Sequence, residues 1–148
     1  MLKGISALTI AQLNQIPTGF NNNIAWHLGH LVASQQGLCY VRAEVNPRVT
    51  EIIMSNYRSG TKPEAPIDIS AFSELKDLLF STLDQFEIDY NTNLFANYKP
   101  WTTRYDVEIR TIDDALQFLS FHEGLHLGTI QSMQRLVSNE ASTSKTIV

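Results

Sequence analysis

Apolar residues recur at the spacing of an α-helix along nearly the whole chain, and no other feature of the sequence constrains the fold as strongly. Long helices are predicted at about residues 24–42, 68–89 and 111–137, with shorter ones at 7–15 and 50–54. The helix at 68–89 places five apolar side chains on one face: Phe72, Leu75, Leu79, Leu83 and Phe86. Three long amphipathic helices and one short one bury such faces best as an all-α, antiparallel four-helix bundle.

Four of the five predicted helices, all but the one at 7–15, start with a residue that can accept a hydrogen bond from the first helical turn. The candidates are Asn21, Asn22 or Asn23, then Thr50, then Asp68 or Ser70, and finally Thr111 with Asp114 in a capping box. The helical pattern weakens between residues 91 and 110. Tyr105, Val107 and Ile109 alternate there, but we expect a packed loop rather than a strand.

The length of 148 residues fits a single domain, which we place at residues 1–137. Residues 138–148 are rich in Ser, Thr and Lys and are expected to form a flexible C-terminal tail. The eleven Lys and Arg residues are spread along the sequence without a cluster, and the net charge is −4, so no nucleic-acid partner is expected. No apolar run is long enough to span a membrane, and a single cysteine fits a reducing compartment. We therefore expect a cytoplasmic protein.

Two histidines, His122 and His126, lie four residues apart in the predicted helix at 111–137. At about 100° per residue, His126 lies about 40° from His122, and both fall within the apolar stripe. Two such buried imidazoles each need partners for both ring nitrogens, whereas a shared metal ion satisfies one nitrogen of each. The arrangement therefore favours metal binding over a purely structural pair.

The predicted helix at 24–42 carries the other two histidines, His27 and His30. His30 falls on the inward face of that helix and is the predicted third ligand. His27 lies about 60° away from His30 and is expected to be a neighbour of the site or an alternate ligand. Three neutral imidazoles leave a coordination position open, which is typical of a catalytic centre rather than a closed structural site.

The run from His122 to His126 also spells H-E-x-x-H, which is typical of zinc peptidases in which the glutamate is the general base. Such peptidases take a third ligand from further along the chain, but no histidine follows His126, and Glu140 is the only carboxylate there. Glu123 lies at the border of the apolar stripe, about 100° from His122. A peptidase is thus the less favoured alternative, with Glu123 as a candidate base beside the metal.

Two segments of the chain resemble the DinB superfamily of four-helix-bundle metalloproteins. They are residues 23–31 (NIAWHLGHL) and residues 122–130 (HEGLHLGTI), and the connector at 57–63 (YRSGTKP) is also similar. The family has a Trp-containing stretch that ends in a ligand histidine, followed far downstream by His-x3-His with Gly and Ile. The resemblance implies a DinB-like bundle with His30, His122 and His126 as metal ligands, and it does not require His27 to be one.

The resemblance also implies a divalent metal ion, zinc or nickel. Characterised relatives include transferases and isomerases that use bacillithiol or mycothiol. The implied function is therefore a thiol-dependent S-transferase that acts on small electrophiles, with a low-molecular-weight thiol as partner. A non-enzymatic, metal-stabilised stress-response or binding module is the alternative. Trp101, Arg104 and Tyr105 precede the last helix and are expected to line the mouth of the pocket.

The first helix of this family is normally long, whereas only its final turns are recognisable here before Thr18. A bundle with a shortened first helix would expose apolar side chains along one face. We therefore expect a homodimer in which a second copy covers that face.

Overall fold

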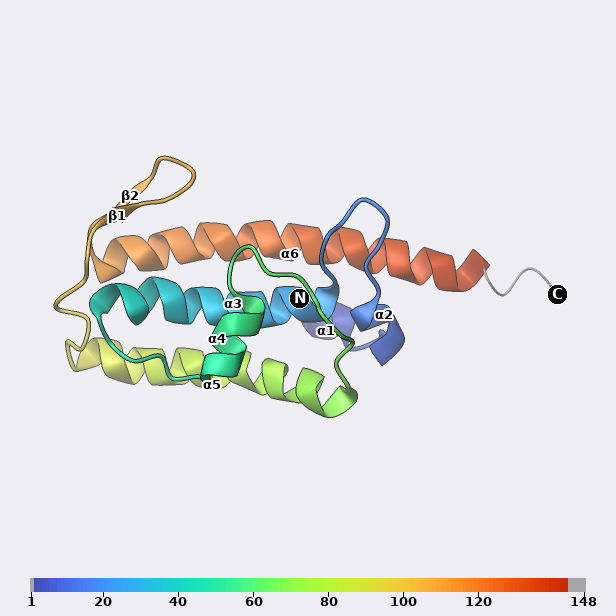
Figure 1. The fold of residues 1–148 in the computed structure, drawn as a ribbon, viewed down its shortest axis with the longest axis horizontal. Helices are drawn as coiled ribbons and strands as arrows, with labels where there is room; N and C mark the ends of the chain where they lie inside the picture. The colour runs from blue at the N-terminus through green and yellow to red at the C-terminus, as the bar shows by residue number, and fades with distance from the viewer. Residues whose placement is uncertain (1, 144–148) are drawn as a thin grey trace.

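The computed structural model describes residues 2–143 and confirms the all-α fold (Figure 1). Its elements are α1 (Leu2–Ile5), α2 (Ile10–Asn14), α3 (Ile24–Cys39), the 3-10 helix η1 (Val41–Ala43), α4 (Glu51–Tyr57), α5 (Ile69–Asn91), β1 (Trp101–Thr102), β2 (Glu108–Ile109) and α6 (Ile112–Thr143). No helix in this part of the chain is both long and apolar enough to cross a lipid bilayer.

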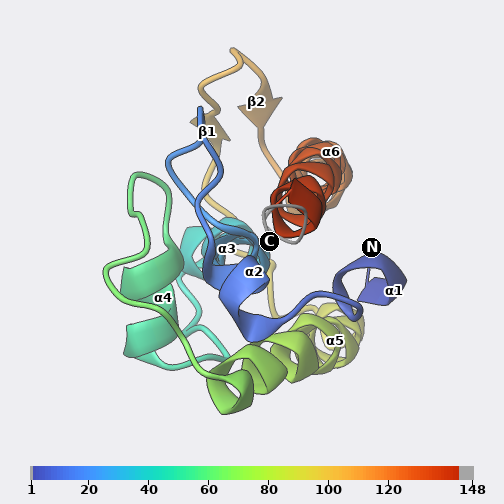
Figure 2. The same ribbon diagram turned by 90° about the vertical axis from the view of Figure 1, so that its right-hand side faces the viewer.

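Helix α3 lies at the centre of the bundle, and α4, α5 and α6 pack around it (Figure 2). Its sequence is apolar on nearly every side, so only Ser34, Gly37 and Leu38 are not fully buried. One buried cluster contacts the start of α3 (Ile5, Leu28, Met133) and another lies at its end (Tyr40, Phe86, Leu119). Side chains of α3 are therefore held rigidly, because packed interiors leave few alternative positions.

Helices α3 and α5 run in the same direction, which corrects the antiparallel arrangement predicted from the sequence. Their starts lie together, because Ile24 and Phe72 share one core cluster. Their ends also lie together, because the Tyr40 hydroxyl donates a hydrogen bond of 2.8 Å to Asp89. Helix α6 runs the opposite way (Figure 1). The segment at 40–68 carries the chain back along the bundle, so consecutive long helices need not be antiparallel.

The predicted caps of the four helices from α3 to α6 are confirmed. The side chains of Asn23, Thr50 and Asp68 accept hydrogen bonds from the first turns of α3, α4 and α5. Thr111 and Asp114 form the predicted reciprocal pair at the start of α6, at 3.2 and 3.0 Å. These caps define the first residues of α3 and α6. They thereby contribute to which side chains of the two helices lie opposite one another.

Two details of the middle of the chain were predicted wrongly. Leu83 is 50% exposed, and the neighbouring Thr82 faces the core in its place. The expected loop at 91–110 contains a short antiparallel hairpin, in which Trp101 pairs with Ile109. Strands of two residues are too short to leave a clear alternating pattern in the sequence.

Both ends of the chain also differ from the prediction. The helix expected at 7–15 is the shorter α2, which Thr9 and Gln12 cap reciprocally, and the separate helix α1 precedes it. Helix α6 continues to Thr143, beyond the predicted end at 137. The rest of the predicted tail, residues 144–148, lies outside the described residues, and its flexibility stays a prediction.

The contact between α3 and α4 depends on Gly29. A Cβ atom built at Gly29 would lie 2.6 Å from Cε1 of Tyr57 and closer still to other atoms of the same ring. The absence of a side chain at this position therefore lets the Tyr57 ring rest directly on the backbone of α3. This close approach also sets the position of the Tyr57 backbone.

We predict that Gly29→Ala lowers the free energy of unfolding by about 1–3 kcal/mol, because α4 must move to accommodate the new methyl group. Gly37→Ala is the matched control in the same helix, since its Cβ would meet no atom within 4 Å. That change should leave the stability unchanged or raise it by up to about 1 kcal/mol. Urea denaturation followed by circular dichroism measures both, and equal stabilities of the two variants would contradict the close contact.

Candidate metal centre

The four histidines of the chain meet where α6 crosses α3. His30 of α3 and the pair His122 and His126 of α6 each present a ligand atom, and these three atoms lie within 4.8 Å of one another. The Nε2 atoms of His122 and His126 are 3.2 Å apart. His27 adjoins the cluster, with its Nδ1 atom 2.8 Å from Nδ1 of His126. The structure thus brings together every histidine that the sequence indicated.

Two contacts hold the ring of His30, a hydrogen bond at its edge and a stacked indole on its face. Its Nδ1 atom lies 2.7 Å from the backbone carbonyl oxygen of Tyr57, which can only accept a hydrogen bond. The proton therefore resides on Nδ1, and Nε2 has a lone pair available for a metal ion. The indole ring of Trp26 stacks on the imidazole at 4.6 Å, with an angle of 11° between the planes. Trp26 is itself anchored by a hydrogen bond of 3.1 Å from its Nε1 atom to Thr61.

His27 contacts His126 and lies outside the group of three ligand atoms. If the Nδ1 atom of His126 donates to His27, the Nε2 atom of His126 is left unprotonated and faces His122. An imidazole ligand held in this way by a neighbouring acceptor has a fixed tautomer and ring orientation. The expectation that His27 neighbours the site agrees with this geometry.

All four imidazoles favour the neutral form, which is the form that binds metals. Burial, together with the charge of nearby imidazoles, lowers the pKa of His27 and His122 to about 4 and that of His126 to about 3. Burial also lowers the pKa of His30, although its hydrogen bond to Tyr57 acts in the opposite direction. At neutral pH, protons therefore compete only weakly with a metal ion for these nitrogens.

The donor set fits a divalent ion. Two imidazole nitrogens bound to one tetrahedral zinc ion are roughly 3.3 Å apart, close to the 3.2 Å between His122 and His126. The Nδ1 atom of His122 is buried and has no hydrogen-bond partner among the described residues. Its position on the ring points away from the Nε2 atom that faces His126, so this atom is not itself directed at the ion. Three nitrogen donors suit zinc and nickel alike.

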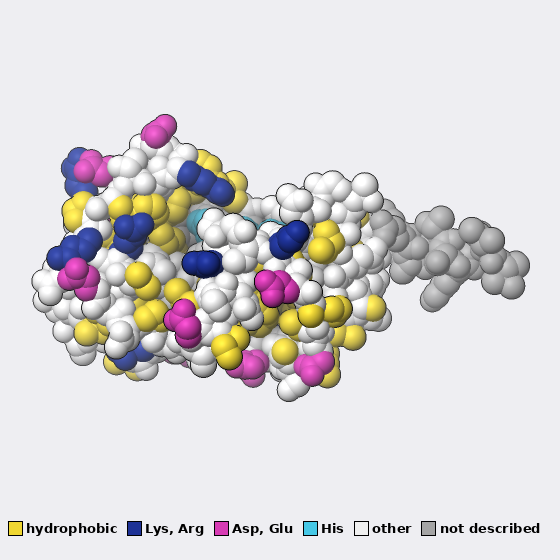
Figure 3. All heavy atoms as spheres, viewed as in Figure 1, with side chains coloured by type: hydrophobic (Ala, Val, Ile, Leu, Met, Phe, Trp, Pro, Cys, Tyr) yellow, Lys and Arg dark blue, Asp and Glu magenta, His cyan; other side chains and the backbone are white. Residues whose placement is uncertain are grey.

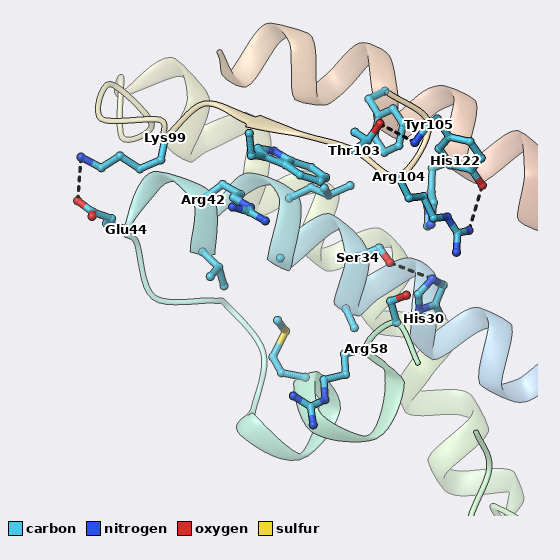
Figure 4. Close-up of a pocket in the computed structure, with 18 residues that line it drawn as sticks. His30, Ser34, Arg42, Glu44, Arg58, Lys99, Thr103, Arg104, Tyr105 and His122 are labelled. Carbon is cyan, nitrogen blue, oxygen red and sulfur yellow. Dashed lines mark hydrogen bonds and ion pairs between the residues drawn. The ribbon is translucent and has the colours of Figure 1, made fainter. Parts of the chain in front are cut away.

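A cavity of about 670 Å³ opens beside the cluster, with His30 and His122 in its wall. The three residues of α3 that are not fully buried, Ser34, Gly37 and Leu38, all line it. Figure 3 shows a histidine side chain at the bottom of a hollow that Lys and Arg side chains surround. The hairpin and the end of α4 form the other walls (Figure 4). The volume is typical of sites that bind small molecules.

Trp101, Arg104 and Tyr105 line this cavity, as the sequence predicted. Glu123 does not: its side chain is exposed and is absent from the cavity wall and from the histidine cluster. Cys39 is fully buried, and burial raises the pKa of its thiol to about 12, so it is not a nucleophile at neutral pH.

Two groups that contact the His30 ring were missed from the sequence. The Ser34 hydroxyl lies 3.2 Å from Nε2 of His30 and would be displaced from that lone pair by a bound ion; its spacing of four residues within the helix could have indicated the contact. The Tyr57 carbonyl has no such signal, because a backbone oxygen leaves no trace in the residue type.

Comparison with known proteins identifies one family. Residues 1–130 match the family model described as the DinB superfamily. No curated protein and no solved structure gives a match. The matched range includes all four histidines and every element from α1 to the middle of α6.

We predict that the protein binds about one divalent ion per chain, and that His30→Ala, His122→Ala and His126→Ala each abolish stoichiometric binding. His27→Ala should keep the stoichiometry but weaken the affinity roughly ten- to a hundredfold, because His126 loses its orienting partner. Competition titrations with a chromophoric chelator measure both quantities, with circular dichroism to verify folding. Absence of binding to the wild type would contradict the metal centre, and complete loss in His27→Ala would make His27 a ligand.

Proposed function

This chain belongs to the DinB superfamily, and we propose that it is a zinc- or nickel-dependent enzyme that transfers low-molecular-weight thiols to small electrophiles. One observation carries the proposal: three neutral histidines meet at the edge of a cavity large enough for a small-molecule substrate. A metal centre that serves only for stability has no need of an adjoining cavity.

The chemistry follows from the donor set. A divalent ion, when bound, stabilises the thiolate form of a thiol, which is the form that attacks electrophiles. The three imidazoles carry no charge, so they leave the full positive charge of the site for an anionic sulfur. The stack of Trp26 on His30 and the hydrogen bond from His30 to the Tyr57 carbonyl hold the His30 ring, which lines the cavity together with His122.

The cavity wall determines where an electrophile would lie. Phe118 and Trp101 are 6.4 Å apart, edge to face, and both line the cavity with His122. These rings provide an apolar surface for a substrate and exclude water from the reacting atoms. The thiol sulfur forms the new bond to the electrophilic carbon, the leaving group departs with its electron pair, and the thiol proton passes to solvent.

The peptidase alternative is less well supported by the geometry. In H-E-x-x-H enzymes the glutamate must reach the water that attacks the peptide bond. The Glu123 side chain is exposed on α6 and does not line the cavity. A non-enzymatic module would be favoured instead if His27 closed the site as a fourth ligand.

We predict that metal-loaded protein accelerates conjugation of a thiol from a low-molecular-weight panel to monochlorobimane. Chelation and His122→Ala should each reduce the rate to the uncatalysed level, because the thiolate is no longer stabilised. Glu123→Gln is the matched control and should keep the wild-type rate. Turnover that persists after removal of the metal, or that is lost in Glu123→Gln, would contradict the mechanism.

We also propose that two copies of the chain form a homodimer through one flank of α5. Phe80 and Leu83 are about half exposed there and share this flank with Tyr90, whose hydroxyl donates to Asp113 of α6. Exposed apolar side chains at adjacent turns are typical of an interface.

A dimer of this kind predicts a mass of twice 16.7 kDa in light scattering, and a monomer for Leu83→Lys. Ile88→Lys, an equally exposed apolar position away from this flank, is the control and should remain dimeric. A wild-type monomer at high concentration would contradict the dimer without affecting the proposed chemistry.

A further inference from the structure

Positively charged side chains gather in the cavity beside the histidines, although Lys and Arg are spread along the sequence without a cluster. Four of the eleven Lys and Arg residues line it, namely Arg42, Arg58, Lys99 and Arg104. Glu44 is the only acidic residue in the wall, although the whole chain has fifteen and a net charge of −4. Residues far apart in the sequence are thus brought together by the return segment at 40–68 and by the hairpin.

The arginines of this wall are not neutralised by the protein. The Nζ atom of Lys99 lies 3.3 Å from Oε2 of Glu44, so the one carboxylate in the wall is paired with the lysine. No described carboxylate forms an ion pair with the three arginines. Arg42 lies over the ring of Trp101, 4.4 Å from its centroid, and Arg104 donates a hydrogen bond of 3.0 Å to the Tyr105 hydroxyl. Each arginine therefore retains donors for an incoming anion.

Arg104 lies nearest to the metal centre. Figure 4 shows its guanidinium group directed from the hairpin toward His30 and His122. Its charge contributes to the lowered pKa of His30, His122 and His126, which agrees with this placement. Arg58, at the end of α4, lies in the opposite wall. The two arginines thus carry positive charge on two walls of the same cavity.

The remaining wall is largely apolar. It includes Leu38 and Val41 near the end of α3, Met54 of α4, and the rings of Trp101 and Phe118. A ligand that satisfies both kinds of surface needs an acidic group and an apolar body. The enclosed volume limits it to a small molecule, and the acidic remainder of the chain disfavours long polyanions.

We propose that this cavity binds a small organic anion, with its carboxylate, sulfonate or phosphate group between Arg104 and Arg58 and its apolar part against Trp101 and Phe118. The identification of this anion as a substrate rests on the proposed function. Its binding does not, because the arginines and aromatic rings that would hold it are not among the three candidate metal ligands.

Two fluorescent dyes that differ by one acidic group test this directly: 1-anilinonaphthalene-8-sulfonate and the neutral N-phenyl-1-naphthylamine. We expect the metal-free wild type to bind the sulfonate about tenfold more tightly than the neutral dye. Arg104→Gln and Arg58→Gln should each remove most of this preference and leave the affinity for the neutral dye unchanged.

Two control variants test whether the dye binds in this cavity and not elsewhere on the surface. Arg135→Gln removes an exposed charge of α6 outside the cavity, and Leu83→Ser removes an apolar side chain on the flank of α5. Neither should alter the preference. Equal wild-type affinities for the two dyes, or a loss in Arg135→Gln as large as in Arg104→Gln, would overturn the proposal.

The same titrations separate this inference from the proposed function. A sulfonate preference that depends on Arg104 supports the anion site even if no thiol is turned over. Thiol conjugation without any preference for the anionic dye supports the proposed function and overturns the anion site.

Discussion

Four imidazoles, three of them buried and that of His126 half-buried, meet at one level of the contact between α3 and α6, and the surrounding structure compensates for the cost of burying them. A buried imidazole loses its hydration and must be neutral, hydrogen-bonded or bound to a metal ion. The Tyr57 carbonyl provides one partner for His30, and His27 provides one for His126. Among the described residues, the Nδ1 atom of His122 has none. The facing Nε2 atoms of His122 and His126 lie 3.2 Å apart, the spacing of two nitrogens that bind one ion. The caps at Asn23 and Thr111 contribute to the register that places the histidines opposite one another.

Local sequence patterns predict much of this arrangement. The helix starts at Asn23, Thr50, Asp68 and Thr111 follow from side chains that accept hydrogen bonds from the first turn, which is a property of a few adjacent residues. The inward positions of His30 and His122 follow from helical periodicity alone. These features were predicted because neither depends on the path of the chain between helices.

Features that depend on that path were not predicted. The parallel course of α3 and α5 is set by the return segment at 40–68, whose sequence has little regular pattern. The exposure of Leu83 follows from the same packing, because helical spacing identifies an apolar face but not its exact orientation toward a neighbour. The basic lining of the cavity is a further case, since Arg42 and Arg104 are distant in sequence and come to line one cavity only after folding.

The central claim is that three histidines, and no other protein group, hold a divalent ion beside the cavity. X-ray absorption spectroscopy of the zinc-loaded protein counts the imidazole ligands through their outer-shell scattering and identifies the remaining donors. The account predicts three imidazoles and at least one light-atom donor from solvent, with an unchanged spectrum in Glu123→Gln. Four imidazoles would contradict the account and show that His27 is a fourth ligand. A carboxylate donor that disappears in Glu123→Gln would also contradict it and would favour a peptidase.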